Sequence, residues 1–227
     1  MKTKSIYSKI CLLAAVAFTT ISLSSCKKND LNSSESFDIK VVNASQNSGT
    51  QTFTLAGQFL VGGLNYGDAS SYITTTSGTR LIAEFKNESG GAVTATGELY
   101  TDNGVRFTTY LVGEGSSRKV KSFKDNLSLP ASGRARVKFV HLSDAAPSDI
   151  NIRNSSGDNL VTNISRYTDS GYQDINPGTL SLRLVGTALR NTVGNFEVTG
   201  LEAGKIYSIY LTGSTDATLN VQKVTHN

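Results

Sequence analysis

The sequence predicts an all-β protein that consists of two tandem immunoglobulin-like β-sandwich domains after a cleaved lipoprotein signal peptide. Apolar and polar residues alternate with a period of two, as they do in half-buried strands. Turn residues such as Gly, Asn and Ser interrupt these runs about every 8–12 residues, a spacing typical of β-sandwiches. A long internal repeat is the third observation, and it predicts two copies of one domain.

The first 25 residues have the features of a bacterial export signal. Lysines precede an apolar run from Ile10 to Ile21, and Leu23-Ser24-Ser25-Cys26 follows it. The last four residues resemble the lipobox, at which a signal peptidase cleaves before a lipidated cysteine. The apolar run is shorter than the roughly 20 residues that span a bilayer. We therefore expect a signal peptide over residues 1–25, lipidation of Cys26 and a polar tether over residues 26–35.

A lipid anchor of this kind predicts a location in the cell envelope, on the outer membrane. Two or more acyl chains hold a protein stably, because each buried methylene contributes about 0.8 kcal/mol. Lys27-Lys28-Asn29-Asp30 partly resembles a signal for export to the cell surface. Surface exposure is therefore favoured, and the periplasmic face remains the alternative.

Composition excludes several classes of function. Without the three lysines of the leader, the mature chain has 19 basic and 18 acidic residues, which is not the charge of a nucleic-acid-binding protein. Cys11 lies in the leader and Cys26 is the expected lipidation site, so no thiol remains for a disulfide or a nucleophile. Stability must therefore come from core burial, and we expect no cofactor.

The internal repeat defines the domain boundaries. At a shift of about 100 residues, three pairs of segments match: Ile39–Ser45 with Val137–Ser143, Tyr66–Tyr72 with Tyr167–Tyr172, and Tyr110–Gly113 with Tyr210–Gly213. We predict a first domain over residues 36–126, a linker over residues 127–133 and a second domain over residues 134–227.

The second copy opens with Ala-Arg-Val-Lys at 135–138, and His-Leu-Ser-Asp-Ala-Ala-Pro-Ser-Asp-Ile follows at 141–150. This segment resembles the opening signature of the domain of unknown function 4397 family, whose members read like A-R-V-R-V-x-H-x-S-P-D-A-P-x-V-D-V. The resemblance implies a β-sandwich in a secreted or lipid-anchored bacterial protein, often in tandem, and it implies no activity. In the first copy Asn43 replaces the histidine, and the aspartate and proline are missing.

The turn that follows this strand carries His141, Asp144 and Asp149, and we predict a structural role for it. The other histidine, His226, is the penultimate residue of the chain, and no nucleophile motif accompanies His141, so a catalytic dyad is not indicated. We expect its ring to bond the backbone of the turn. Calcium held by Asp144 and Asp149 with Asp158 or Asn159 is the alternative, but the spacing matches no calcium loop, and we expect no metal.

Tyrosines are the candidates for recognition, because the chain has no tryptophan. The candidate binding residues are Tyr66, Tyr72, Tyr110, Tyr167, Tyr172 and Tyr210. The alternative for each is a structural role, either as a tyrosine corner or as a residue between sheets or domains.

These observations predict a non-enzymatic envelope lipoprotein. We expect its sandwich modules to bind a glycan or an envelope protein at the cell surface, and its lipid to bind the membrane. One alternative is an assembly subunit that pairs with another chain through exposed strand edges. A hydrolase accessory domain is the least favoured alternative.

Overall fold

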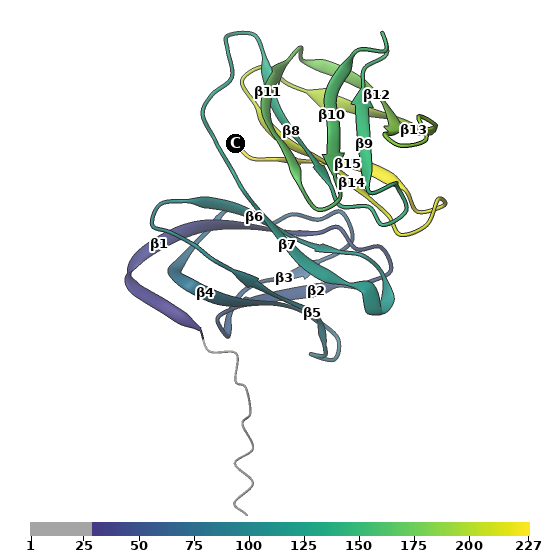
Figure 1. Cartoon of the computed structure of the whole chain (residues 1–227). Coiled ribbons are helices and arrows are strands. Elements are labelled where there is room, and N and C mark those ends of the chain that lie inside the picture. Colours follow the sequence, from purple (N-terminus) through teal and green to yellow (C-terminus); the bar gives the residue numbers. More distant parts are fainter. Residues whose placement is uncertain (1–28) are drawn as a thin grey trace, which may run out of the picture.

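The computed structural model of the chain describes residues 29–227, which form two β-sandwiches, one above the other in Figure 1. The all-β prediction is confirmed, because residues 29–227 contain no α-helix and only a short 3-10 helix at Gly115–Ser117. The predicted signal peptide and Cys26 lie outside the described residues.

The first domain is built from β1 (Asp30–Asn43), β2 (Gln51–Leu55), β3 (Gln58–Leu64), β4 (Ile73–Asn87), β5 (Val93–Leu99), β6 (Arg106–Val112) and β7 (Lys119–Lys124). One sheet has the order β4-β1-β6-β7, and the other has the order β3-β2-β4-β5. The strand β4 belongs to both sheets, because its first part pairs with β1 and its second part pairs with β2 and β5. The neighbours β1 and β6 are parallel.

The second domain repeats this arrangement. Its strands are β8 (Ala135–His141), β9 (Asp149–Arg153), β10 (Asn159–Ser165), β11 (Asp169–Ile175), β12 (Gly178–Gly186), β13 (Thr192–Leu201), β14 (Ile206–Thr212) and β15 (Asn220–Thr225). The two sheets have the orders β11-β8-β14-β15 and β10-β9-β12-β13, and β8 is parallel to β14. The strand pairings therefore support the internal repeat that was read from the sequence.

The domains differ where β4 is continuous and its counterpart is divided into β11 and β12. Pro177 lies at the division and has no backbone N–H to donate to a neighbouring strand. Gly178 follows with a φ of 113°, a conformation that favours glycine. In the first domain Ser77 and Gly78 continue the strand instead.

The backbone corrects one part of the sequence repeat. The Gly67 N–H donates to the Asn43 carbonyl oxygen (2.8 Å), and the Tyr167 N–H donates to the equivalent His141 carbonyl oxygen (2.6 Å). Both donors have a positive φ, 90° at Gly67 and 64° at Tyr167. Tyr167 is therefore the counterpart of Gly67 and not of Tyr66, and the sequence match was displaced by one residue.

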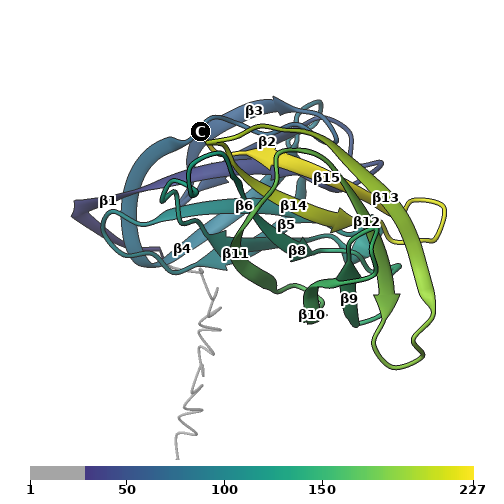
Figure 2. The ribbon, with the colours of Figure 1, turned by 90° about the horizontal axis from the view of Figure 1, so that it is seen from above.

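Each sandwich has its own apolar core between its two sheets. Leu81, Ala83 and Phe85 point into the first core, and Leu182 and Leu184 point into the second. This is the inward set that the period of two predicts. Figures 1 and 2 show that the sheet holding β8, β14 and β15 faces the sheet holding β1, β6 and β7.

Candidate functional site

A third apolar cluster joins the two domains through the outer faces of these sheets. Its fully buried members are Val42, Ala44, Tyr110, Val112, Val140, Leu142, Tyr210 and Val224. The rings of Tyr110 and Tyr210 lie 5.3 Å apart at an angle of 59°. Burial raises the pKa of both phenols. Two of the candidate recognition tyrosines are thus enclosed between the domains and present no surface to solvent.

A polar cluster beside these rings is centred on Asp125, in the segment that follows β7. Its carboxylate lies 2.8 Å from the Lys138 ammonium, and the two side chains are 0% and 1% exposed. It accepts hydrogen bonds from Tyr72 (2.8 Å), Thr108 (2.6 Å) and Tyr172 (3.2 Å). Burial by itself raises the pKa of Asp125, but Lys138 and these donors stabilise the carboxylate, and the pKa is lowered overall.

His226 completes this cluster from the end of the chain. Its Nδ1 lies 2.8 Å from the Tyr72 hydroxyl oxygen, and its Nε2 lies 2.8 Å from the Ser208 hydroxyl oxygen. Because Tyr72 donates its own proton to Asp125, the hydroxyl oxygen must accept from His226, and Ser208 must donate to Nε2. Burial lowers the pKa of His226 to about 4, so the ring is neutral at pH 7.

The two domains contribute equivalent positions to this cluster. The backbone registers pair the following residues of the first and second domains: Lys40 with Lys138, Tyr72 with Tyr172, Thr108 with Ser208, and Asp125 with His226. The domains therefore meet through the same face of each copy, as the subunits of a two-fold symmetric dimer do.

The chain of hydrogen bonds from Ser208 through His226 and Tyr72 to Asp125 has the polarity of a nucleophile–base–acid relay. Ser208 is 0% exposed, however, and it lies between the domains. A substrate carbonyl has no approach to its hydroxyl group in this structure. We conclude that the relay is sealed and that its hydrogen bonds hold the domains together.

Sequence reasoning missed this cluster. His226 was treated as a chain terminus, and its partner Tyr72 lies 154 positions earlier in the chain. Extending the repeat by one residue beyond the last strands would have aligned Asp125 with His226 and pointed to a shared position.

The signature turn of the second domain lies apart from this cluster. His141 is buried, and its Nε2 lies 2.9 Å from the Pro147 carbonyl oxygen, to which it must donate. Burial lowers the pKa of His141, so the ring is neutral. Within the described residues, its Nδ1 has no hydrogen-bond partner. The ring thus bonds the backbone of the turn at Pro147.

The two aspartates of the turn are engaged by different donors. Asp144 accepts a short hydrogen bond from the Tyr167 hydroxyl group and lies 3.7 Å from the Arg166 guanidinium. Asp149 accepts from Ser165 (2.5 Å) and Ser148 (2.8 Å), and these bonds lower its pKa. In residues 29–227 no group of three His, Cys, Asp or Glu side chains is placed to hold a metal ion.

Tyr167 also contacts the first domain. Lys119 and Lys121 of β7 lie over its ring, 4.5 and 4.7 Å from the centroid. Lys119 in addition donates to its hydroxyl oxygen (2.8 Å). Together with Tyr72, Tyr110, Tyr172 and Tyr210, Tyr167 contributes to the contact between the domains.

Tyr66 has different surroundings. It lines a hollow of about 470 Å³, together with Gly67 and Asp68 of the first domain and residues of β13 and β15 of the second. Its hydroxyl oxygen accepts from Gln46 (3.0 Å), and the same Gln46 amide donates to the Thr218 carbonyl oxygen (2.9 Å). Tyr66 is therefore a candidate recognition tyrosine that lies at an opening of the surface.

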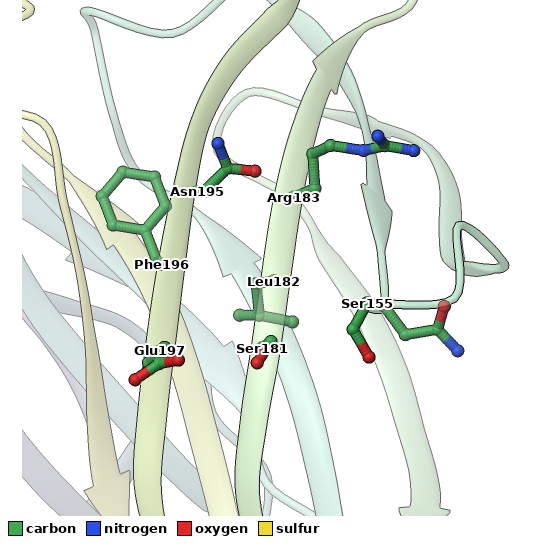
Figure 3. A pocket seen from close by; sticks show the side chains of 8 residues that line it. Ser155, Ser181, Leu182, Arg183, Asn195, Phe196 and Glu197 are labelled. Carbon is green, nitrogen blue, oxygen red and sulfur yellow. The ribbon is translucent and has the colours of Figure 1, made fainter.

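A second hollow, of about 350 Å³, lies on the sheet that holds β9, β12 and β13 (Figure 3). Ser181 and Arg183 of β12 lie beside Glu197 and Asn195 of β13, and Asn154 and Ser155 come from the turn after β9. No residue of this hollow was among the sequence candidates. The outward positions of alternating strands carry no distinctive motif, so the sequence offered no signal for it.

Comparison with known proteins places the chain in a family. A family profile matches residues 37–152 of the 227 residues. The chain belongs to the family described as domain of unknown function DUF4397. The DUF4397 match begins within β1 and covers the rest of the first sandwich and the connecting segment. It ends in the second domain at Ile152 of β9. It thus includes both the first copy and the signature turn of the second.

Two solved structures are similar to this DUF4397 protein at low TM-scores. The C-terminal domain of AlgF from P. aeruginosa matches 41% of this chain and 98% of that domain, with 21% identity and a TM-score of 0.31. The CBM26 module of Eubacterium rectale Amy13K, solved with maltoheptaose, matches 82% of this chain and 97% of that module, with 14% identity and a TM-score of 0.29. No curated protein matches the sequence. In residues 29–227 no helix is long and apolar enough to cross a bilayer.

Proposed function

We propose that this protein is a non-enzymatic, lipid-anchored binding protein of the bacterial cell envelope, and that its two DUF4397-like sandwiches act as one rigid binding module. The leader and Cys26 support the anchor and the outer-membrane location. The tether predicted over residues 26–35 is too long, because β1 begins at Asp30 and pairs with β4 from there. The few residues between Cys26 and Asp30 would hold the module close to the membrane and leave its far surfaces open to a glycan or a protein partner.

The observation that carries the proposal is the continuous core between the domains. Tyr110 and Tyr210 are fully buried there, and the Asp125–Lys138 ion pair is sealed beside them. A binding surface that spans both domains then keeps its shape, so ligand binding costs little conformational entropy of the protein. The hollow at Tyr66 draws its lining from both domains and is such a surface.

The sealed relay supports the non-enzymatic part of the proposal. Catalysis by Ser208 would require a substrate atom within about 3 Å of a hydroxyl group that is 0% exposed. Assays of the purified chain for esterase and glycosidase activity should stay at the level of the Ser208→Ala variant. Activity above that level would contradict the proposal.

The anchor is tested by labelling cells with a radioactive or alkyne-tagged fatty acid. We expect the wild-type chain to take up label, and Cys26→Ala to take up none, because the thioether cannot form. A matched control, Ser25→Ala, keeps a small residue before the cysteine and should retain the label. Labelling of Cys26→Ala at the wild-type level would mean that the anchor lies elsewhere. Protease treatment of intact cells then separates surface display from a periplasmic location.

An assembly role is the second candidate, and an edge strand favours it. The strand β3 ends the sheet β3-β2-β4-β5 and carries Phe59 with 62% of its surface exposed. An exposed edge of this kind can pair with a strand of another chain. Fixed envelope partners that co-purify with the wild type and are lost with Phe59→Lys would support this candidate over glycan binding.

A further inference from the structure

The hollow on the second domain gathers polar side chains that have no protein partners. In Figure 3, Arg183 and Asn195 lie at one level of the sheet, and Glu197, Ser181 and Ser155 lie at the next. The backbone register explains this order, because Arg183 is paired with Asn195 and Ser181 is paired with Glu197 across β12 and β13. Neighbouring strands thus place a cation, an amide, a carboxylate and hydroxyl groups around one concave surface of about 350 Å³.

Within the part of the chain that the structure describes, the side chains of Ser181, Arg183, Asn195 and Glu197 make no hydrogen bond or ion pair, and the Arg183 Nε is buried. By contrast, Arg80 and Glu98 on β4 and β5 of the first domain form an ion pair (2.6 Å). The Arg183 guanidinium thus has no acceptor among the described residues, and a carboxylate bound in the hollow would accept from its terminal nitrogens.

The hollow at Tyr66 lies next to this one. Glu197 lines both, because it belongs to the edge strand β13 that separates them. The hollow at Tyr66, of about 470 Å³, adds Gln222 and Lys223 from β15 and the Tyr66 ring from the first domain. Hollows of about 300–1,000 Å³ accommodate small ligands, so two in succession suit an elongated molecule.

We propose that the two hollows form one groove for an acidic saccharide chain, in which a hexuronate carboxylate binds Arg183 and the hydroxyl groups of neighbouring neutral sugars bind Asn195 and Glu197. This inference rests on the proposed function as a binding protein and names its ligand class. The Tyr66 ring would provide the apolar surface on which a sugar ring lies.

The chemistry of the lining selects this class. A guanidinium has a planar set of donors that matches the two oxygens of a carboxylate. Glu197 accepts hydroxyl protons, and it repels a second carboxylate placed beside it. A chain that carries a charge on every unit would therefore bind less well than a chain in which acidic and neutral sugars alternate. Nucleic acid is disfavoured for the same reason.

Isothermal titration calorimetry of the full chain in detergent tests the proposal. The acidic probes are a hyaluronan tetrasaccharide and a glucuronoxylan fragment, in which glucuronate stands beside neutral sugars. Chitotetraose and xylotetraose are the neutral counterparts, and sodium glucuronate is the simple anion. We expect an acidic probe to bind at least about tenfold more tightly than its neutral counterpart and than glucuronate alone, a difference of about 1.4 kcal/mol.

Variants identify the carboxylate site. Arg183→Gln should abolish the preference for the acidic probe, and Asn195→Asp should weaken acidic binding by adding a like charge. Arg190→Gln is the matched control, because Arg190 is an exposed arginine of the same domain that does not line the groove. It should bind as the wild type does. Circular dichroism and thermal melting would show that each variant is folded.

The inference would be overturned by no binding of either acidic probe, by equal binding of the neutral counterparts, or by an unchanged preference in Arg183→Gln. Binding of glucuronate alone as tightly as the tetrasaccharide would reduce the site to a single anion subsite and also overturn the groove. None of these results would affect the fatty-acid labelling of Cys26 or the capture of surface partners. Failure of the inference is therefore distinguishable from failure of the proposed function.

Discussion

Tyr110 and Tyr210 occupy equivalent positions on β6 and β14, and their rings meet across the domain boundary with centroids 5.3 Å apart. Their hydroxyl groups differ. The Tyr210 hydroxyl group donates to the Gln222 amide oxygen (2.5 Å), whereas the buried Tyr110 hydroxyl group has no hydrogen-bond partner among the described residues. The Tyr210 hydroxyl group is therefore hydrogen-bonded, and the Tyr110 hydroxyl group is not.

Removing each hydroxyl group should have a different effect on stability. Tyr110→Phe removes an unsatisfied polar atom and should leave the free energy of unfolding unchanged or raise it, since the ring is kept. Tyr210→Phe removes a hydrogen bond and leaves Gln222 without its donor, which should cost about 1–2 kcal/mol. Urea denaturation of the two variants provides the comparison. A larger loss in Tyr110→Phe than in Tyr210→Phe would contradict this account.

Breaking the buried ion pair from one side should be far more costly than removing it whole. Asp125→Asn leaves the Lys138 ammonium buried without its close counter-charge and should cost about 3–5 kcal/mol. The double variant Asp125→Asn with Lys138→Met should be more stable than the sum of the single variants implies. A double-mutant cycle measures this coupling.

The matched control for that cycle is the exposed pair of Lys124 and Asp102, whose nitrogen and oxygen lie 3.7 Å apart. Its coupling should be close to zero, because solvent screens exposed ion pairs. Equal coupling in the two cycles would show that the Asp125–Lys138 pair is open to water.

Stability should fall as the pH falls from about 6.5 to about 4, since His226 is neutral in the folded chain and takes up a proton on unfolding in this range. His226 alone accounts for a loss on the order of 3 kcal/mol. The Asp125 carboxylate, whose pKa is lowered, loses its contribution only at still lower pH. His141 acts in the same direction as His226.

Guanidinium denaturation at a series of pH values measures this dependence. His226→Gln should be less stable at pH 7.5, and its stability should depend less steeply on pH than that of the wild type. The remaining slope then belongs to His141 and the carboxylates. An unchanged slope would mean that His226 is not buried between the domains.

Calcium should not raise the melting temperature of the chain. The Asp144 carboxylate already accepts the Tyr167 hydroxyl proton and lies near Arg166, whose charge repels a cation. Asp144→Asn keeps an acceptor for Tyr167 and should cost less than about 1 kcal/mol. A rise in melting temperature in millimolar calcium that disappears in Asp144→Asn would show that the turn is a binding site.

The all-β fold could be predicted from the sequence because strands depend on local pattern. Alternation of apolar and polar residues in segments such as Leu180–Leu184 predicts which face of the strand packs against the core. In the structure the same face packs against the core. Lipidation of Cys26 stays a prediction, since that residue lies outside the described part of the chain.

The surface between the domains could not be derived from alternation, because there both faces of a strand are buried. All seven residues of β14, Ile206–Thr212, are buried, and so are the last six of β6. A strand of this kind reads as a nearly continuous apolar run, and its second face was assigned to solvent. For this reason Tyr110 and Tyr210 were candidate recognition residues, and a position between sheets or domains was only the alternative. Asp125 was missed because it follows the last strand of its domain.

The equivalence of Asp125 and His226 shows what covalent linkage of two like domains permits. The His226 Nε2 and an Asp125 carboxylate oxygen lie 3.9 Å apart, close to the approximate symmetry axis. In a homodimer of one such domain, this position would face its own copy, and two aspartates at that distance would repel each other. A single chain that carries both halves escapes this restriction. It can place an acid on one side of the axis and a neutral base on the other. Both residues are then present in every molecule, and the pairing of acid with base does not depend on two different subunits finding each other.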